Sequence, residues 1–215
     1  MPSFFALPTD SMAPPDRQSP VSRGESTDKR AALLDAALDL FAREGHQSVT
    51  TAAIAERAGV AKGTLFVYFD SRQNLVNQLY LEVVDRYIAT VTDAVDPSSS
   101  KEVRFRAYWF ALARWYLEER SAANVMLQLE ASSALDETTE ARKEEMEAQM
   151  VRSHFPGADP GGRGSPPRRI VHALTAGPIL AFAHLREKGA AEITDELLEQ
   201  TFARVKRAVM PEDER

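Results

Sequence analysis

The chain has 215 residues, of which 44% are hydrophobic and 27% are charged, a balance typical of a globular protein with a hydrophobic core. It contains no cysteine, which excludes disulfides and thiolate metal sites and favours a reducing, cytoplasmic setting. The formal net charge is −6, but residues 1–72 hold eight basic and nine acidic residues. The charge of this near-neutral part therefore does not exclude a polyanionic partner. No apolar run reaches the roughly 20 residues that cross a bilayer, and the N-terminus lacks the features of a signal peptide.

The first part of the chain divides into a tail and a helix. Residues 1–26 are rich in Pro, Ser and Asp, which predicts a disordered tail. Ser26, Thr27 and Asp28 are helix-capping residue types, and they predict the start of the first helix. Apolar residues then recur at helical spacing, and Gly45 fits the left-handed end of that helix.

Two short helices and one long helix are predicted next. In "VTTAAIAERAGV", Thr50 is suited to cap a short helix that Gly59 ends, with Val49 and Ile54 as a hydrophobic staple. The segment "AKGTLFVYF" predicts a second short helix of about two turns. Asp70 and Ser71 then cap a long helix.

The remainder predicts further helices and no strand. Ser99 with Glu102 forms a capping-box pattern before "VRFRAYWFALARWYLEE", and Thr194 is placed to cap a last helix that ends near Met210. The Gly/Pro-rich residues 156–167 predict a flexible linker. The chain is therefore predicted to be all-α, with about nine helices.

The segment 59–75, "GVAKGTLFVYFDSRQNL", could be a strand, a phosphate-binding loop or a short helix. Poor alternation and two glycines argue against a strand, and the spacing of a P-loop is absent. Two short helices joined by a tight turn, after a longer helix, instead predict a helix-turn-helix. Leu65 and Phe69 are its expected anchors, packing on Phe41, Ile54 and Ala58.

Residues 29–75 resemble the DNA-binding domain of the tetracycline-repressor (TetR) family. The resemblance rests on "LDAALDLFAREG", "TTAAIAERAGVAKGTLFVYF" and "SRQNL", without gaps. It implies an N-terminal three-helix helix-turn-helix domain at 27–74 and a C-terminal helical domain for ligand binding and dimerisation at 75–215. It also implies a homodimer that reads a palindromic DNA operator and responds to a small-molecule effector.

Carried over by position, the resemblance implies eight residues that contact DNA: Thr50, Thr51, Lys62, Gly63, Thr64, Phe66, Tyr68 and Arg72. The two threonines would bind phosphate, Lys62 would read guanine, and Tyr68 and Arg72 would hold the DNA backbone. The chain departs from the family pattern at Phe66, where a tyrosine often contacts phosphate, and at Ala52, where some members carry a polar base reader.

Aromatic residues crowd onto the helix after Ser99 and cover more than one of its faces. They predict either a helical-bundle core or the walls of an apolar ligand pocket. The candidate walls are Tyr108, Trp109, Leu112, Trp115, Met126, Leu129 and Phe182, with Arg106, Gln128, Glu130 and His184 as possible polar partners.

The last two helices, with "ALTAGPILAFAH" and "LLEQTFARV", resemble the dimerisation region of the family; intramolecular packing is the alternative. The four histidines lack metal-ligand spacing, so neither a metal nor a cofactor is expected.

The sequence thus predicts a DNA-binding transcriptional regulator, a ligand-responsive repressor, rather than an enzyme. A helix-turn-helix adaptor that binds a protein and a helical enzyme that uses the aromatic pocket are the alternatives. Salt-sensitive, sequence-selective binding in a gel-shift assay distinguishes the regulator from both.

Overall fold

The computed structural model describes residues 23–155 and 168–210, and within them every regular element is helical. Nine α-helices and one 3-10 helix lie in these residues, as the all-α prediction requires. The elements are α1 (Arg23–Glu44), α2 (Thr51–Arg57), η1 (Lys62–Thr64), α3 (Leu65–Tyr68), α4 (Arg72–Asp93), α5 (Lys101–Glu118), α6 (Arg120–Ala131), α7 (Glu137–His154), α8 (Arg168–Glu187) and α9 (Asp195–Val209). Residues 1–22 of the predicted tail and the predicted linker at 156–167 lie outside the described residues.

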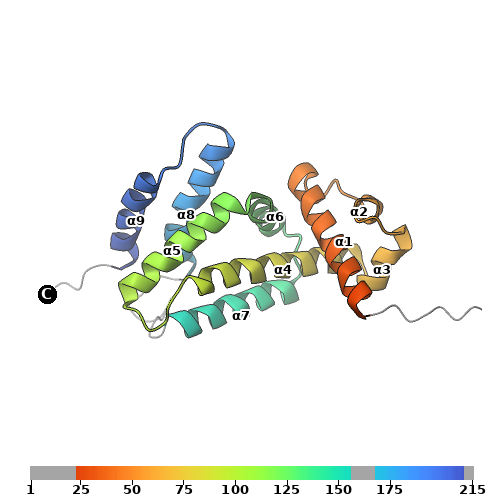
Figure 1. The fold of residues 1–215 in the computed structure, drawn as a ribbon, viewed down its shortest axis with the longest axis horizontal. Helices are drawn as coiled ribbons and strands as arrows, with labels where there is room; N and C mark the ends of the chain where they lie inside the picture. Colours follow the sequence, from red (N-terminus) through yellow and green to blue (C-terminus); the bar gives the residue numbers. More distant parts are fainter. Residues whose placement is uncertain (1–22, 156–167, 211–215) are drawn as a thin grey trace, which may run out of the picture.

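Helices α1, α2 and α3 form a small unit at one end of an elongated molecule, and we call this unit the head (Figure 1). Helix α1 contacts α2 and α3, and η1 packs between α2 and α3. Gly45 and Gly59 have φ angles of +78° and +68°, a conformation that side chains with a Cβ rarely adopt, so both glycines end helices as predicted. Helix α1 begins at Arg23, ahead of the capping residues that were expected to start it.

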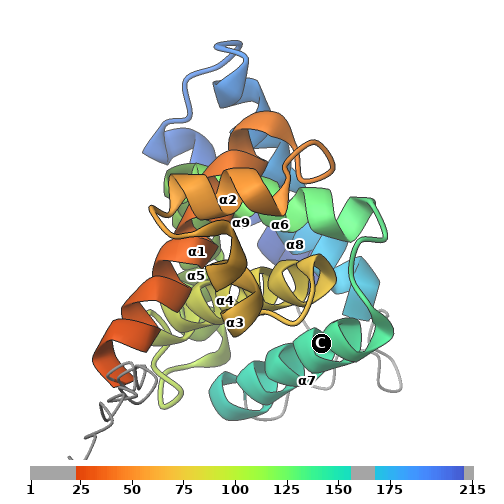
Figure 2. The same ribbon diagram turned by 90° about the vertical axis from the view of Figure 1, so that its right-hand side faces the viewer.

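The rest of the described chain forms a helical body in which α4 is central. This helix leaves the head and packs against α5, α6 and α7, while α5 also contacts α8 and α9. In Figure 1, α8 and α9 lie towards the end of the molecule opposite the head, and Figure 2 shows α2 and α3 from the head end. Helix α6 returns to contact α1, so the body touches the head both through α4 and through the α1–α6 contact.

Hydroxyl side chains cap three helices, α2, α4 and α9, at the predicted positions. Ser71 Oγ accepts a hydrogen bond from the Asn74 amide at 3.0 Å at the start of α4, and Thr194 Oγ1 caps α9. The prediction that Ser99 caps α5 is wrong by one residue. The Ser99 hydroxyl donates to Asp96 at 3.1 Å and closes the preceding turn, so Ser100 caps α5 instead.

Candidate nucleic-acid interface

The segment after α2 forms a short rod made of two kinds of turn. The Thr64 amide donates to the Ala61 carbonyl at 2.8 Å, which makes Lys62–Thr64 a 3-10 turn. The Phe69 amide donates to the Leu65 carbonyl at 2.9 Å, which closes one α-helical turn. The predicted two-turn helix is therefore a 3-10 turn that continues into a single α turn. We call η1 and α3 together the reading rod.

The reading rod is held from behind by two buried side chains. Leu65 is 0% and Phe69 1% exposed, and both belong to the same buried cluster as Phe41 and Ile54, with Ala58 packed against it. Since residues four apart lie on one face of a helix, burial of Leu65 and Phe69 turns the residues between them outward. The predicted anchors thus occupy the predicted place.

The outward side of the rod carries one cation and two large apolar side chains. Lys62 and Gly63 are exposed, and a Cβ atom added at Gly63 would meet no other atom within 4 Å. Phe66 is 50% and Val67 78% exposed. Val67 was not among the predicted contacts, although the inward positions of Leu65 and Phe69 place it outside.

Thr64 and Tyr68 are half-buried at the sides of the rod. The start of α2 presents the two threonines that were expected to bind phosphate. Thr50 is exposed, and its Oγ1 accepts a hydrogen bond from the Ala53 amide at 3.2 Å. Thr51 is half-buried and begins the helix. Capping by Thr50 is confirmed, whereas phosphate binding by either residue stays a prediction.

Arg72 lies at the junction between the head and α4 and is engaged within the protein. Its guanidinium donates to the carbonyl oxygen of His46 and lies 5.9 Å from the centroid of the Phe41 ring. These contacts join the start of α4 to the turn between α1 and α2. A phosphate contact by Arg72 would have to use its remaining N–H groups and stays a prediction.

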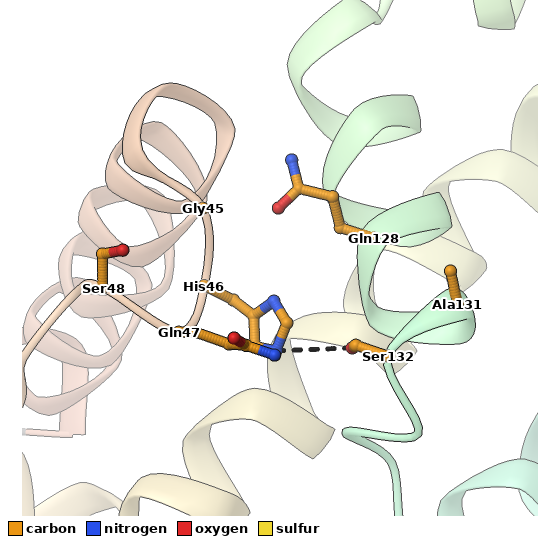
Figure 3. A pocket seen from close by; sticks show the side chains of 7 residues that line it. All are labelled: Gly45, His46, Gln47, Ser48, Gln128, Ala131 and Ser132. Carbon is orange, nitrogen blue, oxygen red and sulfur yellow. Dashed lines mark hydrogen bonds between the residues drawn. The ribbon is translucent and has the colours of Figure 1, made fainter.

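A cavity of about 400 Å³ lies between the turn after α1 and the end of α6 (Figure 3). His46 reaches across it, and its Nε2 lies 3.3 Å from the Ser132 hydroxyl. Burial, and secondly the Arg72 charge, lower the pKa of His46 below 6.5. The neutral imidazole is therefore the form that this contact between head and body favours. The lining residues are Gly45, His46, Gln47, Ser48, Gln128, Ala131 and Ser132.

The depressed pKa of His46 predicts a loss of stability in mild acid. In the unfolded chain His46 takes up a proton at the ordinary histidine pKa of about 6.5, whereas in the folded chain it does so only at lower pH. The free energy of unfolding should therefore fall as the pH drops below about 6.5. The variant His46→Gln should show a smaller fall between pH 7 and 5 in urea unfolding. Equal pH dependence in His46→Gln and wild type would contradict a selectively neutral imidazole.

The side chains predicted to wall a ligand pocket are mostly part of the hydrophobic core. Trp109, Leu112, Trp115, Met126 and Leu129 are buried, while Tyr108 and Phe182 are half-buried. Aromatic residues cover several faces of α5 because several helices surround it. The Trp109 indole donates to the Thr175 carbonyl of α8 at 3.0 Å, and the Trp115 ring lies 5.3 Å from the Tyr87 ring of α4.

A second cavity, of about 210 Å³, lies between α5, α6 and α8. None of the seven predicted wall residues lines this cavity or the one beside His46. The predicted ligand-binding role of those seven residues is therefore still a prediction. The lining residues of the second cavity are Tyr116, Arg120, Ala123, Asn124, Leu127, Leu180, Ala183, His184 and Glu187.

Three of the four possible polar partners are engaged by neighbours in the protein. Gln128 donates to Asn124 at 3.1 Å. Arg106 donates to Glu199 of α9 at 2.7 Å. Glu130 accepts a hydrogen bond from the Tyr80 hydroxyl at 2.6 Å and lies 3.0 Å from the Lys143 ammonium group. Burial and the Glu130 hydrogen bond raise the pKa of Tyr80, which keeps its proton in place to donate. A cationic ligand at Glu130 would therefore compete with Lys143.

The described residues contain no group of three or more histidine or acidic side chains placed to hold a metal ion. In the same part of the chain, no helix is both long enough and apolar enough to cross a membrane.

Comparison with known proteins places the head in a characterised family. Residues 33–79 match the family model described as bacterial regulatory proteins, tetR family. The HTH-type transcriptional repressor KstR2 of Mycobacterium tuberculosis is 30% identical over 88 residues, which cover 41% of this chain and 44% of that protein. The fatty acid metabolism regulator protein of Bacillus subtilis is 28% identical over 75 residues, covering 34% of this chain and 39% of that protein. The chain thus matches less than half the length of either relative.

The resemblance in structure extends over the body as well. A TetR family transcription regulator from Marinobacter aquaeolei VT8 superposes with a TM-score of 0.76 at 25% sequence identity. The superposition covers 87% of this chain and 98% of that one. The match of residues 33–79 to the family model and the shared arrangement of the remaining helices lead to one conclusion: the head is similar to the DNA-binding part of the tetR family of bacterial regulatory proteins, and the whole chain shares the fold of a TetR family transcription regulator.

Proposed function

We propose that this protein is a transcriptional regulator that binds duplex DNA with α2 and the reading rod, and that it acts as a ligand-responsive repressor. The observation that carries the proposal is the reading rod, which Leu65 and Phe69 hold from behind while Lys62 and Gly63 face outward. A relative named as a transcriptional repressor matches 41% of this chain, and the family model of regulatory proteins matches residues 33–79, which include the reading rod. The match of residues 33–79 to a family of regulatory proteins also argues against the enzyme alternative.

The dimensions of the rod suit the major groove, which is about 12 Å wide and admits a helix. Lys62 stands on the first turn of the rod, where its ammonium group can donate to the O6 and N7 atoms of a guanine. Thr50 and Thr51 at the start of α2, with Thr64 and Tyr68 beside the rod, are proposed to hold the phosphate backbone. Such a regulator works in the cytoplasm, beside the DNA that it controls.

A gel-shift titration tests the proposal directly. The full chain should bind a duplex from the region upstream of its own gene more tightly than a scrambled duplex. That binding should weaken steeply with salt, because phosphate contacts release counterions. Absence of selective binding at low salt would contradict the proposal and favour the protein-binding adaptor.

Lys62→Ala should weaken operator binding by about ten-fold per half-site, because a good contact to guanine contributes about 1–3 kcal/mol of discrimination. The melting temperature should stay close to that of the wild type, since Lys62 is exposed. Lys101→Ala removes the same charge at the exposed start of α5 and is the matched control. A comparable loss of melting temperature in Lys62→Ala would mean that Lys62 supports the fold instead.

We propose that a homodimer forms through α8. The apolar face of α9 is buried within the protomer, through Leu198, Phe202 and Val205. Helix α8 instead exposes a stripe of apolar and small residues at helical spacing, and a Cβ atom added at Gly177 would meet nothing within 4 Å. A second copy packed on this stripe would place two heads in two-fold symmetry, as a palindromic operator requires. The stripe consists of Ile170, Ala173, Leu174, Gly177, Ala181 and Leu185.

The helix contacts also offer a route for the proposed ligand response. Helix α4 starts at the head and contacts α5, α6 and α7, so a ligand that shifts any of these helices alters a contact of α4. Suppose that a ligand binds more tightly to a conformation whose heads are wrongly spaced for the operator than to the DNA-binding conformation. The difference between its two binding free energies is then the amount by which it weakens operator binding. Mass spectrometry of small molecules that copurify with the native protein would identify the effector.

A further inference from the structure

The reading rod exposes a large amount of apolar surface for so short a segment. Six large hydrophobic side chains are exposed in the described residues, and two of them, Phe66 and Val67, lie on the four residues of α3. Val67 has the largest exposed fraction of the six, at 78%. Three others lie on α8, where a partner copy is proposed to cover them, but the proposed partner of α3 is DNA.

The rod has few polar groups with which to distinguish bases. Its seven residues, Lys62–Tyr68, contain no Asn or Gln, which recognise adenine through paired hydrogen bonds, and no Asp or Glu, which accept a hydrogen bond from the N4 amine of cytosine. Lys62 is its one exposed residue with a hydrogen-bonding side chain, because Thr64 and Tyr68 are half-buried. What the outward face offers besides Lys62 is apolar contact.

The major groove presents one apolar group on its base edges, the C5-methyl of thymine. On a helix with 3.6 residues per turn, Val67 stands about 200° around the axis from Leu65, which is buried. It therefore points away from the protein, further outward than Phe66. A β-branched side chain also has few rotamers, so Val67 presents a fixed shape to its partner.

We infer that Val67 reads a thymine in each operator half-site by packing against its C5-methyl group. This inference rests on the proposed DNA-binding function and deepens it. It assigns to the operator a thymine at the position that Val67 meets, in addition to the guanine proposed for Lys62.

The test compares duplexes that differ by single methyl groups. The preferred duplex is first selected from a random library with the full-length wild-type chain at fixed salt. Each thymine is then replaced in turn, symmetrically in both half-sites, by uracil, which lacks only the methyl group. At one symmetric position, uracil should weaken wild-type binding about four-fold per half-site, the effect of one buried methyl group. A duplex with 5-methylcytosine at that position should bind the protein more tightly than a duplex with cytosine there, for the same reason.

Variants then identify the side chain that meets the methyl group. Val67→Ala should bind the thymine and uracil duplexes with affinities that agree within about two-fold, because the side chain that packs against the methyl group has been shortened. Phe66→Ala and the control Val103→Ala, which shortens an exposed valine on α5, should keep the wild-type preference for thymine.

Three outcomes would overturn the inference, and they can be told apart. Selective binding with no uracil-sensitive thymine would refute methyl reading while leaving DNA binding intact. A preference for thymine that survives in Val67→Ala but vanishes in Phe66→Ala would assign the contact to Phe66. A library that yields no selected sequence would refute the proposed function together with the inference.

Discussion

Leu65→Ala is expected to lower the free energy of unfolding by about 2–5 kcal/mol, the range for removing a buried leucine side chain from a well-packed core. The Leu65 side chain is fully buried in the cluster that also holds Phe41 and Phe69. Its loss leaves a cavity directly behind the reading rod. Urea unfolding followed by far-ultraviolet circular dichroism measures the change, and operator affinity should fall in parallel.

The matched control for this substitution is Val67→Ala, two residues along the same helix. It removes apolar atoms that are mostly in water, so the free energy of unfolding should change by no more than about 0.5 kcal/mol. Two variants of α3 with equal stabilities would contradict the arrangement in which one side of the rod is core and the other is surface.

Leu174→Glu is expected to convert the proposed dimer into a monomer. It would bring a carboxylate into an apolar contact between two α8 helices, where burial of an unpaired charge is strongly unfavourable. Loss of the second head should weaken operator binding by about 100-fold or more, because linked sites bind with an avidity gain of that order. Size-exclusion chromatography with light scattering gives the mass, and a gel-shift assay gives the affinity.

The control for Leu174→Glu is Val103→Glu, which introduces the same charge at an exposed apolar residue outside the stripe. Val103 is 53% and Leu174 39% exposed, so neither change should unfold the protomer. Dimers in Val103→Glu and monomers in Leu174→Glu would support α8 as the interface. A dimeric Leu174→Glu variant would place the contact elsewhere.

Local signals in the sequence predicted the end of α1 and both ends of α2, because short-range chemistry determines these positions. Gly45 and Gly59 adopt the left-handed conformation that a helix end demands, and Thr50 accepts the hydrogen bond that a first turn leaves open. The same kind of signal failed at α5, where two adjacent serines compete. Only the structure shows that the carboxylate of Asp96 engages Ser99 and leaves the cap to Ser100.

The site was harder to predict where long-range packing decides the outcome. The crowding of aromatic residues on α5 is the same whether they wall a cavity or fill a core, and contacts with Thr175 and Phe202, distant in sequence, place Trp109 in the core. Likewise, the resemblance identified Arg72 by position, but its hydrogen bond to His46 depends on how the turn after α1 approaches α4. The exposure of Val67 could have been predicted, since it follows from the burial of Leu65 and Phe69.

Both tryptophans of the chain lie on α5 within the body, and the head contains neither. Intrinsic tryptophan fluorescence therefore reports selectively on the body. An effector that settles near α5 should quench or shift that signal, whereas fraying of α1–α3 would pass unseen. Indole fluorescence alone would therefore follow changes in the body and miss changes in the head.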